Sequence, residues 1–252
     1  IRYDLIIEDM TWSYSRVASF DDCPYKWFLS YLYRDENGRS LKKKSGFFAE
    51  FGSYMHKILQ MYLSGLLEKE RLSTYYVAHF KENVFSKAPN SKIYMNYFQQ
   101  GFHYLDDFSF PSRSIIGVEE KVDFMFAGRK FTGFVDLISE NGKLIVTDHK
   151  SRTLKPRSKR SKPTKHDAEL DEYLRQLYVY SAAIKGKYGR YPDILEFNCF
   201  RSQAMIQEPF ESKRLYTVED WASKTIDSIA TNDKWSAKPD YWRCNYLCDV
   251  CD

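Results

Sequence analysis

Two carboxylates and a lysine lie close together in two short apolar segments that Asn141-Gly142 joins. Asp136 belongs to the first segment, and Asp148 and Lys150 belong to the second. Because side chains alternate between the two faces of a strand, Asp148 and Lys150 must share one face, together with the apolar residues that precede them. The pattern predicts a β-hairpin that carries an acid and a base at one strand end.

The loop of this hairpin decides whether Asp136 points to the same face. A two-residue Asn-Gly loop would turn Asp136 to the opposite face. A three-residue loop, Glu140-Asn141-Gly142 with its glycine in the left-handed conformation, would pair Ser139 with Lys143 and place Asp136 diagonally beside Asp148. We expect the three-residue loop. Two converging carboxylates repel each other, so this arrangement predicts a hard divalent cation between them.

An isolated Asp-x-Lys is more often part of an ordinary hairpin whose polar ends face water, so other residues must decide. The Gly-x-x-Asp of Gly133–Asp136 followed by the Asp-x-Lys of Asp148–Lys150 resembles the core of the PD-(D/E)XK nuclease superfamily. The flanking residues resemble its RecB-like branch, in which an upstream helix supplies a histidine and a later helix carries Gln-x-x-x-Tyr. Here these are His56, and Gln176 with Tyr180.

Both flanking positions suit helices. His56 lies at the edge of an apolar stripe that runs from Met55 to Leu66, where a structural histidine is the alternative to a metal ligand. Gln176 and Tyr180 are four residues apart and would project from one helix face.

The resemblance implies that His56, Asp136 and Asp148 bind Mg²⁺ or Mn²⁺, with the backbone carbonyl of His149 as a further oxygen ligand. It also implies that Lys150 positions the attacking water and helps to deprotonate it. Gln176 and Tyr180 would orient either the DNA or the lysine.

A further acidic candidate lies in the strand-like run Ile115–Phe124. The family pattern favours Glu119 over Glu120 as a catalytic residue, and the alternative is that either glutamate is only a solvated strand residue.

The cysteines indicate a second metal centre. Cys244, Cys248 and Cys251 crowd into one end of the sequence, and Cys23 precedes Pro24 near the other end. Four thiolates suit tetrahedral zinc or an iron–sulfur cluster. Iron–sulfur members of the RecB-like branch have a similar arrangement, so the resemblance implies a [4Fe–4S] cluster at these four cysteines. Their closing spacing departs from the family pattern, which leaves zinc as the alternative. Cys199 alternates with apolar residues and is expected to be a buried strand residue.

The net charge of +4 is mild, so affinity for nucleic acid must come from local patches. A basic segment begins two residues after Lys150, and its cations include Arg152, Lys155, Arg157, Lys159 and Arg160. We expect these cations to follow the phosphate backbone of DNA by releasing counterions. A disordered, solvated loop is the alternative. Some of the twenty tyrosines and eighteen phenylalanines could stack on unpaired bases, although most are expected in the core.

The predicted fold class is α/β, with a central mixed sheet of the PD-(D/E)XK type flanked by helices. Helices are expected around residues 15–31, 48–67 and 218–230, between 73 and 107, and around Gln176; strands are expected near 115–126, 130–139, 143–150 and Cys199. We expect one nuclease domain over residues 1–252, with a helical lobe at about 12–110, a nuclease core at about 111–232, and a C-terminal cysteine-bearing cap at about 233–252 packed with Cys23.

These features predict a metal-dependent DNA nuclease that hydrolyses phosphodiester bonds. By analogy with the family, we expect an exonuclease acting on single-stranded DNA or DNA ends in recombination, repair, or phage or CRISPR DNA processing, with helicase or recombination proteins as possible partners. The alternatives are a non-cleaving nucleic-acid-binding or assembly subunit and a zinc-bound structural module. No membrane span or secretion signal is visible, so a cytoplasmic protein, in the host cell if viral, is expected.

Overall fold

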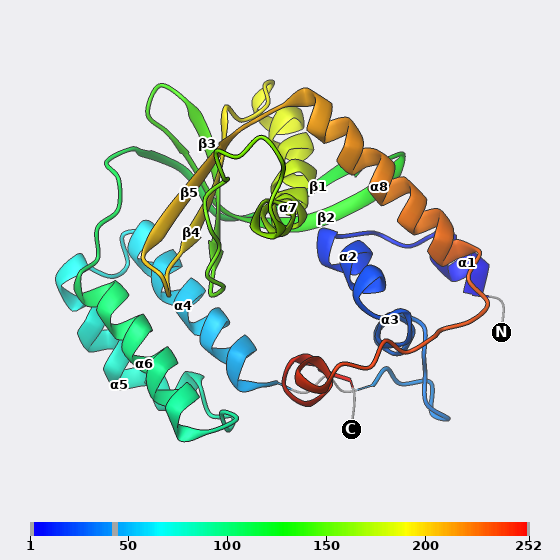
Figure 1. The fold of residues 1–252 in the computed structure, drawn as a ribbon, viewed down its shortest axis with the longest axis horizontal. Coiled ribbons are helices and arrows are strands. Elements are labelled where there is room, and N and C mark those ends of the chain that lie inside the picture. The colour runs from blue at the N-terminus through cyan, green and yellow to red at the C-terminus, as the bar shows by residue number, and fades with distance from the viewer. Residues whose placement is uncertain (1–2, 42–44, 251–252) are drawn as a thin grey trace.

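A five-stranded mixed sheet lies at the centre of the computed structural model, which describes residues 3–41 and 45–250 (Figure 1). The strands lie side by side in chain order, as β1 (Ser114–Phe126), β2 (Arg129–Glu140), β3 (Leu144–Lys150), β4 (Ile194–Cys199) and β5 (Ala204–Pro209). Neighbouring strands are antiparallel except β3 and β4, which are parallel because helix α7 (Lys165–Tyr188) connects them. The predicted α/β class with a central mixed sheet is confirmed.

The hairpin between β2 and β3 has a three-residue loop, but the predicted position of that loop is wrong by one residue. Glu140 pairs with Leu144 and Ser139 pairs with Ile145, so the loop comprises residues 141–143. Gly142 adopts a φ of +81°, which glycine tolerates without steric cost. Because the register differs from the prediction by two residues, every side chain keeps its predicted face.

Helices cover both faces of the sheet (Figure 1). On one face lie α4 (Phe47–Leu63), α5 (Leu72–Asn83) and α6 (Ser91–Asp106), whose apolar side chains pack around Leu137 and Phe200. On the other face lie α7 and α8 (Ser212–Ala230), together with α2 (Tyr14–Asp22) and α3 (Pro24–Tyr31). Helix α1 (Tyr3–Glu8) contacts α8, and short helical turns occupy Lys69–Arg71 and Arg243–Leu247. The two layers of helices bury β3 and β4, whereas much of the edge strand β1 stays accessible.

Several predicted helix bounds were wrong for local reasons. The helix expected over residues 15–31 is two helices, because Pro24 begins α3 and proline cannot continue α2. The helical structure expected between residues 73 and 107 is found as α5 and α6, and Glu50 of α4 accepts hydrogen bonds from the connecting backbone at Phe85 and Ser86. Helix α1 and strand β5 were not predicted.

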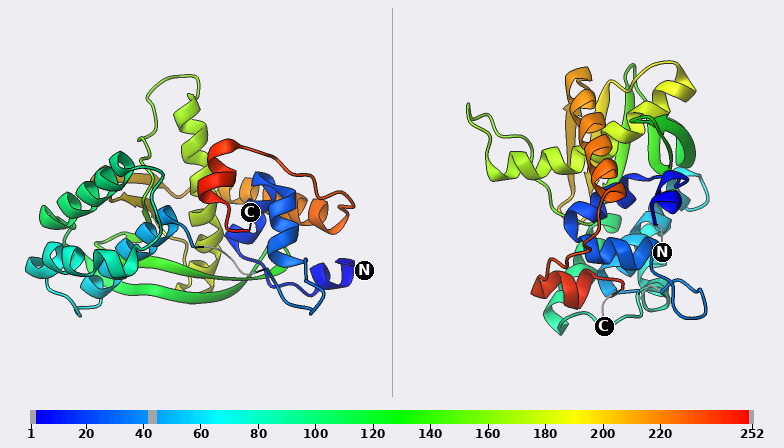
Figure 2. Two further views of the ribbon diagram at one scale, coloured as in Figure 1. Left: turned by 90° about the horizontal axis from the view of Figure 1, so that it is seen from below. Right: turned by 90° about the vertical axis from the view of Figure 1, so that its right-hand side faces the viewer.

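The C-terminal segment lies against the turn between α2 and α3 (Figure 2). The backbone N–H of Lys238 donates to Cys23 Sγ over 3.4 Å, and the Arg243 guanidinium donates to the Asp22 carbonyl oxygen over 2.9 Å. Lys26 forms an ion pair of 3.0 Å with Asp249. These contacts place the C-terminal segment beside Cys23. Among the described helices, none is both long and apolar enough to cross a membrane.

Candidate active site

The candidate site begins where β2 and β3 separate. Their pairing ends at Leu137 and Thr147, and the next residues along are Asp136 and Asp148. The backbone N–H of His149 donates to Asp136 Oδ2 over 2.7 Å, so a carboxylate satisfies this strand N–H. Both carboxylates are buried, with Asp136 9% and Asp148 4% exposed. The sheet therefore opens around two carboxylates that have little access to water.

Lys150 lies beside this opening and is held from two sides. Its Nζ atom is 2.8 Å from Asp148 Oδ2, and it also donates a hydrogen bond of 2.8 Å to Gln176 Oε1. Burial alone would lower the pKa of Lys150, but the neighbouring Asp148 raises it. The amine is therefore held between a carboxylate and an amide oxygen, and Asp148 favours its protonated form.

Tyr180 explains why the sequence has glycine at position 133. A Cβ atom on Gly133 would lie 2.7 Å from Tyr180 Cε1 and 3.1 Å from its hydroxyl oxygen, so only glycine lets the ring pack against β2. The Tyr180 hydroxyl contacts the Gln176 side chain and the Phe134 backbone, and burial raises the pKa of Tyr180 to about 12. The ring is thus a neutral wedge between β2 and the glutamine that holds Lys150.

A histidine and two carboxylates converge on the other side of the opening. Among residues 3–41 and 45–250, His56, Glu119 and Asp136 form the one group of three or more histidine, cysteine, aspartate or glutamate residues whose ligating atoms all lie within 4.8 Å of one another. His56 Nδ1 is 3.5 Å from Asp136 Oδ2 and 3.7 Å from Glu119 Oε1. Asp148 lies outside this group and is turned toward Lys150.

The backbone of Glu119 has an unusual conformation. Its φ is +48°, a left-handed value that costs a residue with a side chain about 1 kcal/mol or more. The flanking pairs Val118 with Leu137 and Glu120 with Val135 place Glu119 across from Asp136. Glu120 instead accepts hydrogen bonds from Lys187 and Tyr188 and takes no part in the group. Of the two glutamates weighed from the sequence, the structure brings Glu119 to the site.

The protonation of this group reveals an excess of negative charge. Burial alone would lower the pKa of His56, but Glu119, Asp136 and Asp148 raise it to about 9. Burial and the nearby Asp148 also raise the pKa of Asp136 to about 7. Both an acid and a base therefore hold protons more tightly than usual, which is the behaviour expected of a pocket short of positive charge.

This donor set fits a hard divalent cation. His56 Nε2 lies 2.8 Å from the His149 carbonyl oxygen, which can only accept, so Nε2 carries the proton and Nδ1 faces the carboxylates. An imidazole nitrogen and two carboxylates suit Mg²⁺ or Mn²⁺, with the imidazole favouring manganese. The His149 carbonyl is thus engaged with His56, and it fixes the orientation of the ring.

The His149 side chain points to the opposite face of the sheet. Its Nδ1 lies 3.1 Å from Asn198 Nδ2, which also donates to the Tyr104 hydroxyl, while its Nε2 has no hydrogen-bond partner within the described residues. Burial lowers the pKa of His149 far below its usual value, so the ring is neutral. Only its backbone takes part in the site. Neither Asn198 nor Tyr173, whose ring lies 5.6 Å from Lys150 Nζ, was singled out from the sequence, and no spacing indicates either.

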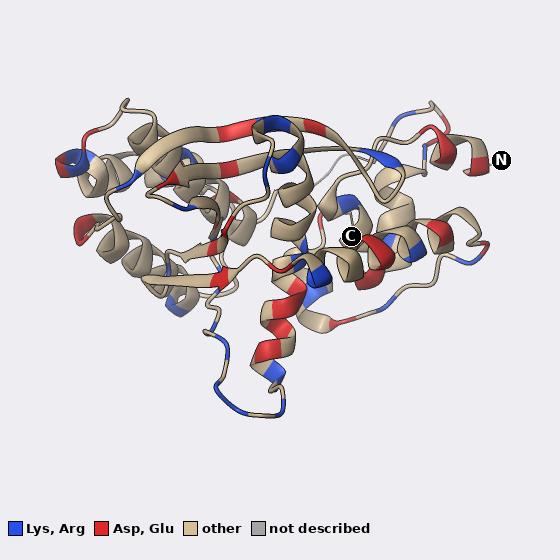
Figure 3. Cartoon of the chain, turned by 90° about the horizontal axis from the view of Figure 1, so that it is seen from above, with Lys and Arg blue, Asp and Glu red and all other residues tan. Residues whose placement is uncertain are grey.

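The basic segment is partly neutralised by the start of α7, where acidic residues gather beside it (Figure 3). Arg157 forms ion pairs of 2.6 Å with Asp171 and with Glu208, and Arg152 forms one of 2.6 Å with Glu169. Lys155 lies 3.3 Å from His166, whereas Lys159 and Arg160 are exposed. Of the five predicted DNA-binding cations, Arg152 and Arg157 therefore also anchor the segment to the protein.

The predicted cysteine ligands are only partly covered by the structure, because Cys251 lies outside the described residues. Cys23, Cys244 and Cys248 are each partly buried at the contact between the C-terminal segment and the start of α3. Within the described part of the chain they do not form a group with ligating atoms inside 4.8 Å. Cys199 is fully buried on β4, as expected.

A protein-family model matches nearly the whole chain. The model described as the PD-(D/E)XK nuclease superfamily matches residues 11–252. The chain belongs to the PD-(D/E)XK nuclease superfamily. Divalent cations typical of this family fit the His56, Glu119 and Asp136 group, and the family implies a DNA substrate and a hydrolytic nuclease activity.

Solved structures add little to this assignment. One is a provisionally named exonuclease from Eubacterium rectale, with 14% identity and a TM-score of 0.49, covering 98% of this chain and 88% of that chain. Another is SSO0001, with 22% identity and a TM-score of 0.29, covering 78% of this chain and 91% of that chain. The search of curated proteins gives no match. The assignment to the superfamily therefore rests on the family model.

Proposed function

We propose that this chain is a Mg²⁺- or Mn²⁺-dependent deoxyribonuclease of the RecB-like branch, and that it acts as an exonuclease on single-stranded DNA or DNA ends. The observation that carries the proposal is the convergence of His56, Glu119 and Asp136 beside the Lys150–Asp148 pair. A pocket with excess negative charge next to a fixed ammonium group is suited to a dication and a phosphate. The exonuclease preference derives from the family resemblance.

The side chains have distinct roles in this proposal. His56, Glu119 and Asp136 would hold the cation, whereas the other two predicted ligands, Asp148 and the His149 carbonyl, are engaged with Lys150 and with His56. When bound, such a cation stabilises negative charge on the scissile phosphate and lowers the pKa of water. Lys150 is kept protonated by Asp148 and orients the attacking water and a phosphate oxygen. Gln176 and Tyr180 fix the position of Lys150.

A non-cleaving DNA-binding subunit is the competing function. It is disfavoured because every polar residue of the family core is present and in contact with another one, whereas a site that had lost its activity is expected to lose such residues. A nuclease assay on end-labelled single-stranded and duplex DNA, with and without Mn²⁺, separates the two functions. End-blocked and open substrates then distinguish endonuclease from exonuclease action.

The adjacent glutamates provide a matched pair for the metal assignment. Glu119→Gln should weaken Mn²⁺ binding by at least about tenfold and reduce cleavage in proportion, because it removes a charged donor from the group. Glu120→Gln should leave both unchanged, since Glu120 pairs with Lys187 instead. Titration calorimetry with Mn²⁺ measures the first effect without turnover.

Lys150→Ala should abolish cleavage while DNA binding is largely retained. Cleavage that survives EDTA, or unchanged turnover in the Lys150 variant, would refute the proposed function. Equal effects of the two glutamate substitutions would instead refute the choice of ligands.

A [4Fe–4S] cluster at Cys23, Cys244, Cys248 and Cys251, with zinc as the alternative, stays a prediction. It is supported by the contacts that bring the C-terminal segment to Cys23. Iron and zinc analysis of the purified protein distinguishes the two metals.

A further inference from the structure

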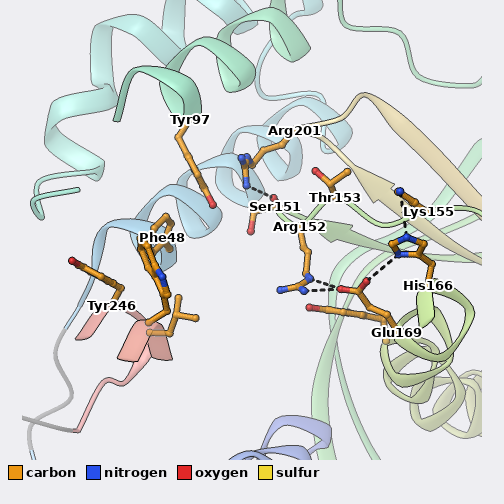
Figure 4. Close-up of a pocket in the computed structure, with 13 residues that line it drawn as sticks. Phe48, Tyr97, Ser151, Arg152, Thr153, Lys155, His166, Glu169, Arg201 and Tyr246 are labelled. Carbon is orange, nitrogen blue, oxygen red and sulfur yellow. Dashed lines mark hydrogen bonds and ion pairs between the residues drawn. The ribbon is translucent and has the colours of Figure 1, made fainter. Parts of the chain in front are cut away.

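A cleft of about 600 Å³ opens directly beyond Lys150. Ser151 and Arg152 form part of its wall, and the other walls come from α4, α6, α7 and the C-terminal segment. Its lining is rich in aromatic rings, namely Phe48, Tyr97, Tyr173, Trp242 and Tyr246. Phe48 and Tyr246 lie on one side of the cleft, across from Arg152, Glu169 and His166 (Figure 4). The cleft is therefore a gap between aromatic surfaces.

Cations lie between these rings. The guanidinium carbon of Arg201 is 3.6 Å from the centre of the Tyr97 ring, and Arg201 Nε donates to Gln100 over 2.7 Å. The guanidinium carbon of Arg152 is 5.8 Å from the Tyr173 ring centre. Lys155 adds a third cation, while Glu169 is the one carboxylate among the described lining residues. The cleft thus offers both flat faces for bases and positive charge for phosphates.

The cleft leads to the candidate active site. The Tyr173 ring contacts Lys150 of the site and Arg152 of the cleft. On α4, a Cβ atom at Gly52 would lie 3.9 Å from Ser151 Oγ of the cleft wall. Gly52 also lines a second cavity of about 360 Å³, together with His56 and Glu119. A chain of nucleotides in the cleft would therefore continue past Gly52 toward the group around His56.

We propose that this cleft binds one unpaired DNA strand and feeds it to the active site. The inference rests on the proposed function and names the form of DNA that it takes. Aromatic rings stack on bases whose faces are free, which is true of an unpaired strand and not of bases inside a duplex. The cations bind the phosphates of any sequence.

Electrostatics favours this path over the neighbouring one. A second groove of about 520 Å³ shares Arg152, Glu169 and Tyr173 with the cleft and runs along α2, but its four carboxylates are matched by four cations, so it has no net charge. The aromatic cleft instead sets Arg152, Lys155 and Arg201 against the single carboxylate of Glu169 among its described lining residues, so it attracts phosphates more strongly. The strand is therefore directed through the aromatic cleft toward Lys150.

The test measures anisotropy of a fluorescein-labelled oligothymidylate in EDTA, so that cleavage plays no part. Stacking on an aromatic side chain contributes roughly 1–3 kcal/mol per base, which corresponds to about 5-fold to 150-fold in Kd. Trp242→Leu, which keeps apolar bulk but removes the flat ring, should weaken binding by at least about fivefold. Trp242→Phe should retain most of the affinity.

Tyr216→Ala is the control, because Tyr216 is an aromatic residue on α8 that is 66% exposed and does not line the cleft. It should leave the Kd unchanged. Arg201→Ala should weaken binding and also reduce its dependence on salt. A hairpin duplex without overhangs should bind the wild type more weakly than the oligothymidylate and should be insensitive to Trp242→Leu.

Equal binding by the Leu and Phe variants, or an equal loss with Tyr216→Ala, would overturn the proposal. So would a duplex that binds as well as the single strand and depends equally on Trp242. Because binding is measured without metal, it can also be measured on Lys150→Ala. If the wild-type protein binds the strand through Trp242 but never cleaves it with metal present, the proposed function is refuted and the assignment of the cleft still holds.

Discussion

Replacing Gly133 with alanine tests the link between the two halves of the site. The added Cβ atom would lie 2.7 Å from Tyr180 Cε1, whereas carbon atoms in contact are normally about 3.5–4.0 Å apart. Either the ring or β2 must therefore move by about 1 Å. Gly133 is not among the glycines with positive φ, so alanine brings no backbone strain and the effect is purely steric.

The size of the effect follows from the packing of Tyr180. The ring is 9% exposed and belongs to the main apolar core, so it has little room to retreat. Overpacking of a core destabilises a protein by about 1–3 kcal/mol. Alanine also reduces the conformational entropy of the unfolded chain, which offsets about 0.4–1 kcal/mol of that loss. We expect a net loss of about 1–2 kcal/mol. Cleavage should fall further, by about tenfold or more, because Tyr180 contacts the glutamine that holds Lys150.

Urea unfolding and initial cleavage rates measure the two effects. Gly186→Ala is the matched control, because Gly186 lies on α7 with Tyr180 and a Cβ atom there would meet nothing within 4 Å. This control should stabilise the protein by about 0.5–1 kcal/mol and leave cleavage unchanged. In a Tyr180→Leu background the clash disappears, so Gly133→Ala should then be neutral or slightly stabilising.

A Gly133→Ala protein with wild-type stability and activity would refute the role of Tyr180 as a wedge. The same conclusion would follow if the cost of Gly133→Ala were undiminished in the Tyr180→Leu background.

Two further predictions concern buried charges. Burial alone would raise the pKa of Glu50, but hydrogen bonds from Ser86 and Phe85 lower it from 4.5. The contribution of Glu50 to the stability of the fold is therefore complete above pH 4.5 and is lost as the pH falls through the pKa of the folded state. Urea unfolding should therefore show Glu50→Gln to be less stable than wild type by about 1–2 kcal/mol at pH 7, with a smaller gap at pH 4; a gap that grows on acidification would contradict this. Arg113→Met should cost about 3–5 kcal/mol in the same assay, because it leaves Glu196 charged and buried after removal of a 2.6 Å ion pair. A loss below 1 kcal/mol would contradict this expectation.

The arrangement around β3 could be predicted from the sequence because it depends on local alternation. Asp148 and Lys150 share a face by strand geometry alone, and any loop with an odd number of residues would bring Asp136 to that face. The exact loop could not be predicted. It depends on which residue closes the turn, here Asn141, whose backbone N–H donates to the Lys143 carbonyl oxygen.

The metal group could not be derived from spacing, since its members come from three elements. His56 entered only through the family resemblance, and its position depends on the carbonyl oxygen of His149. The left-handed φ of Glu119 has no signal in a sequence where glycine is absent from that position. Likewise, Gly133 and Tyr180 were separate parts of the family pattern until the structure placed one against the other.

Counting charges along the sequence also overstated the number of cations in the basic segment that are free to bind DNA. Arg157 pairs with Asp171 and Glu208, which are distant in sequence from it, so it fastens the segment down. Lys159 and Arg160 are exposed cations of the same segment and are available for phosphates. Their contribution to DNA binding should therefore depend on salt, whereas that of Arg157 should act through stability.

The charges of the site together explain why a lysine and a histidine are both needed there. Asp136, Asp148 and Glu119 bring three carboxylates into a buried opening, against one ammonium group from Lys150 and one imidazole from His56. Asp148 pairs with Lys150 but still adds negative charge beside the other two carboxylates. Burial and Asp148 therefore raise the pKa of Asp136, and the three carboxylates together raise that of His56 against the effect of burial. A dication held by His56, Glu119 and Asp136 would offset this negative charge and leave the Lys150–Asp148 pair in place.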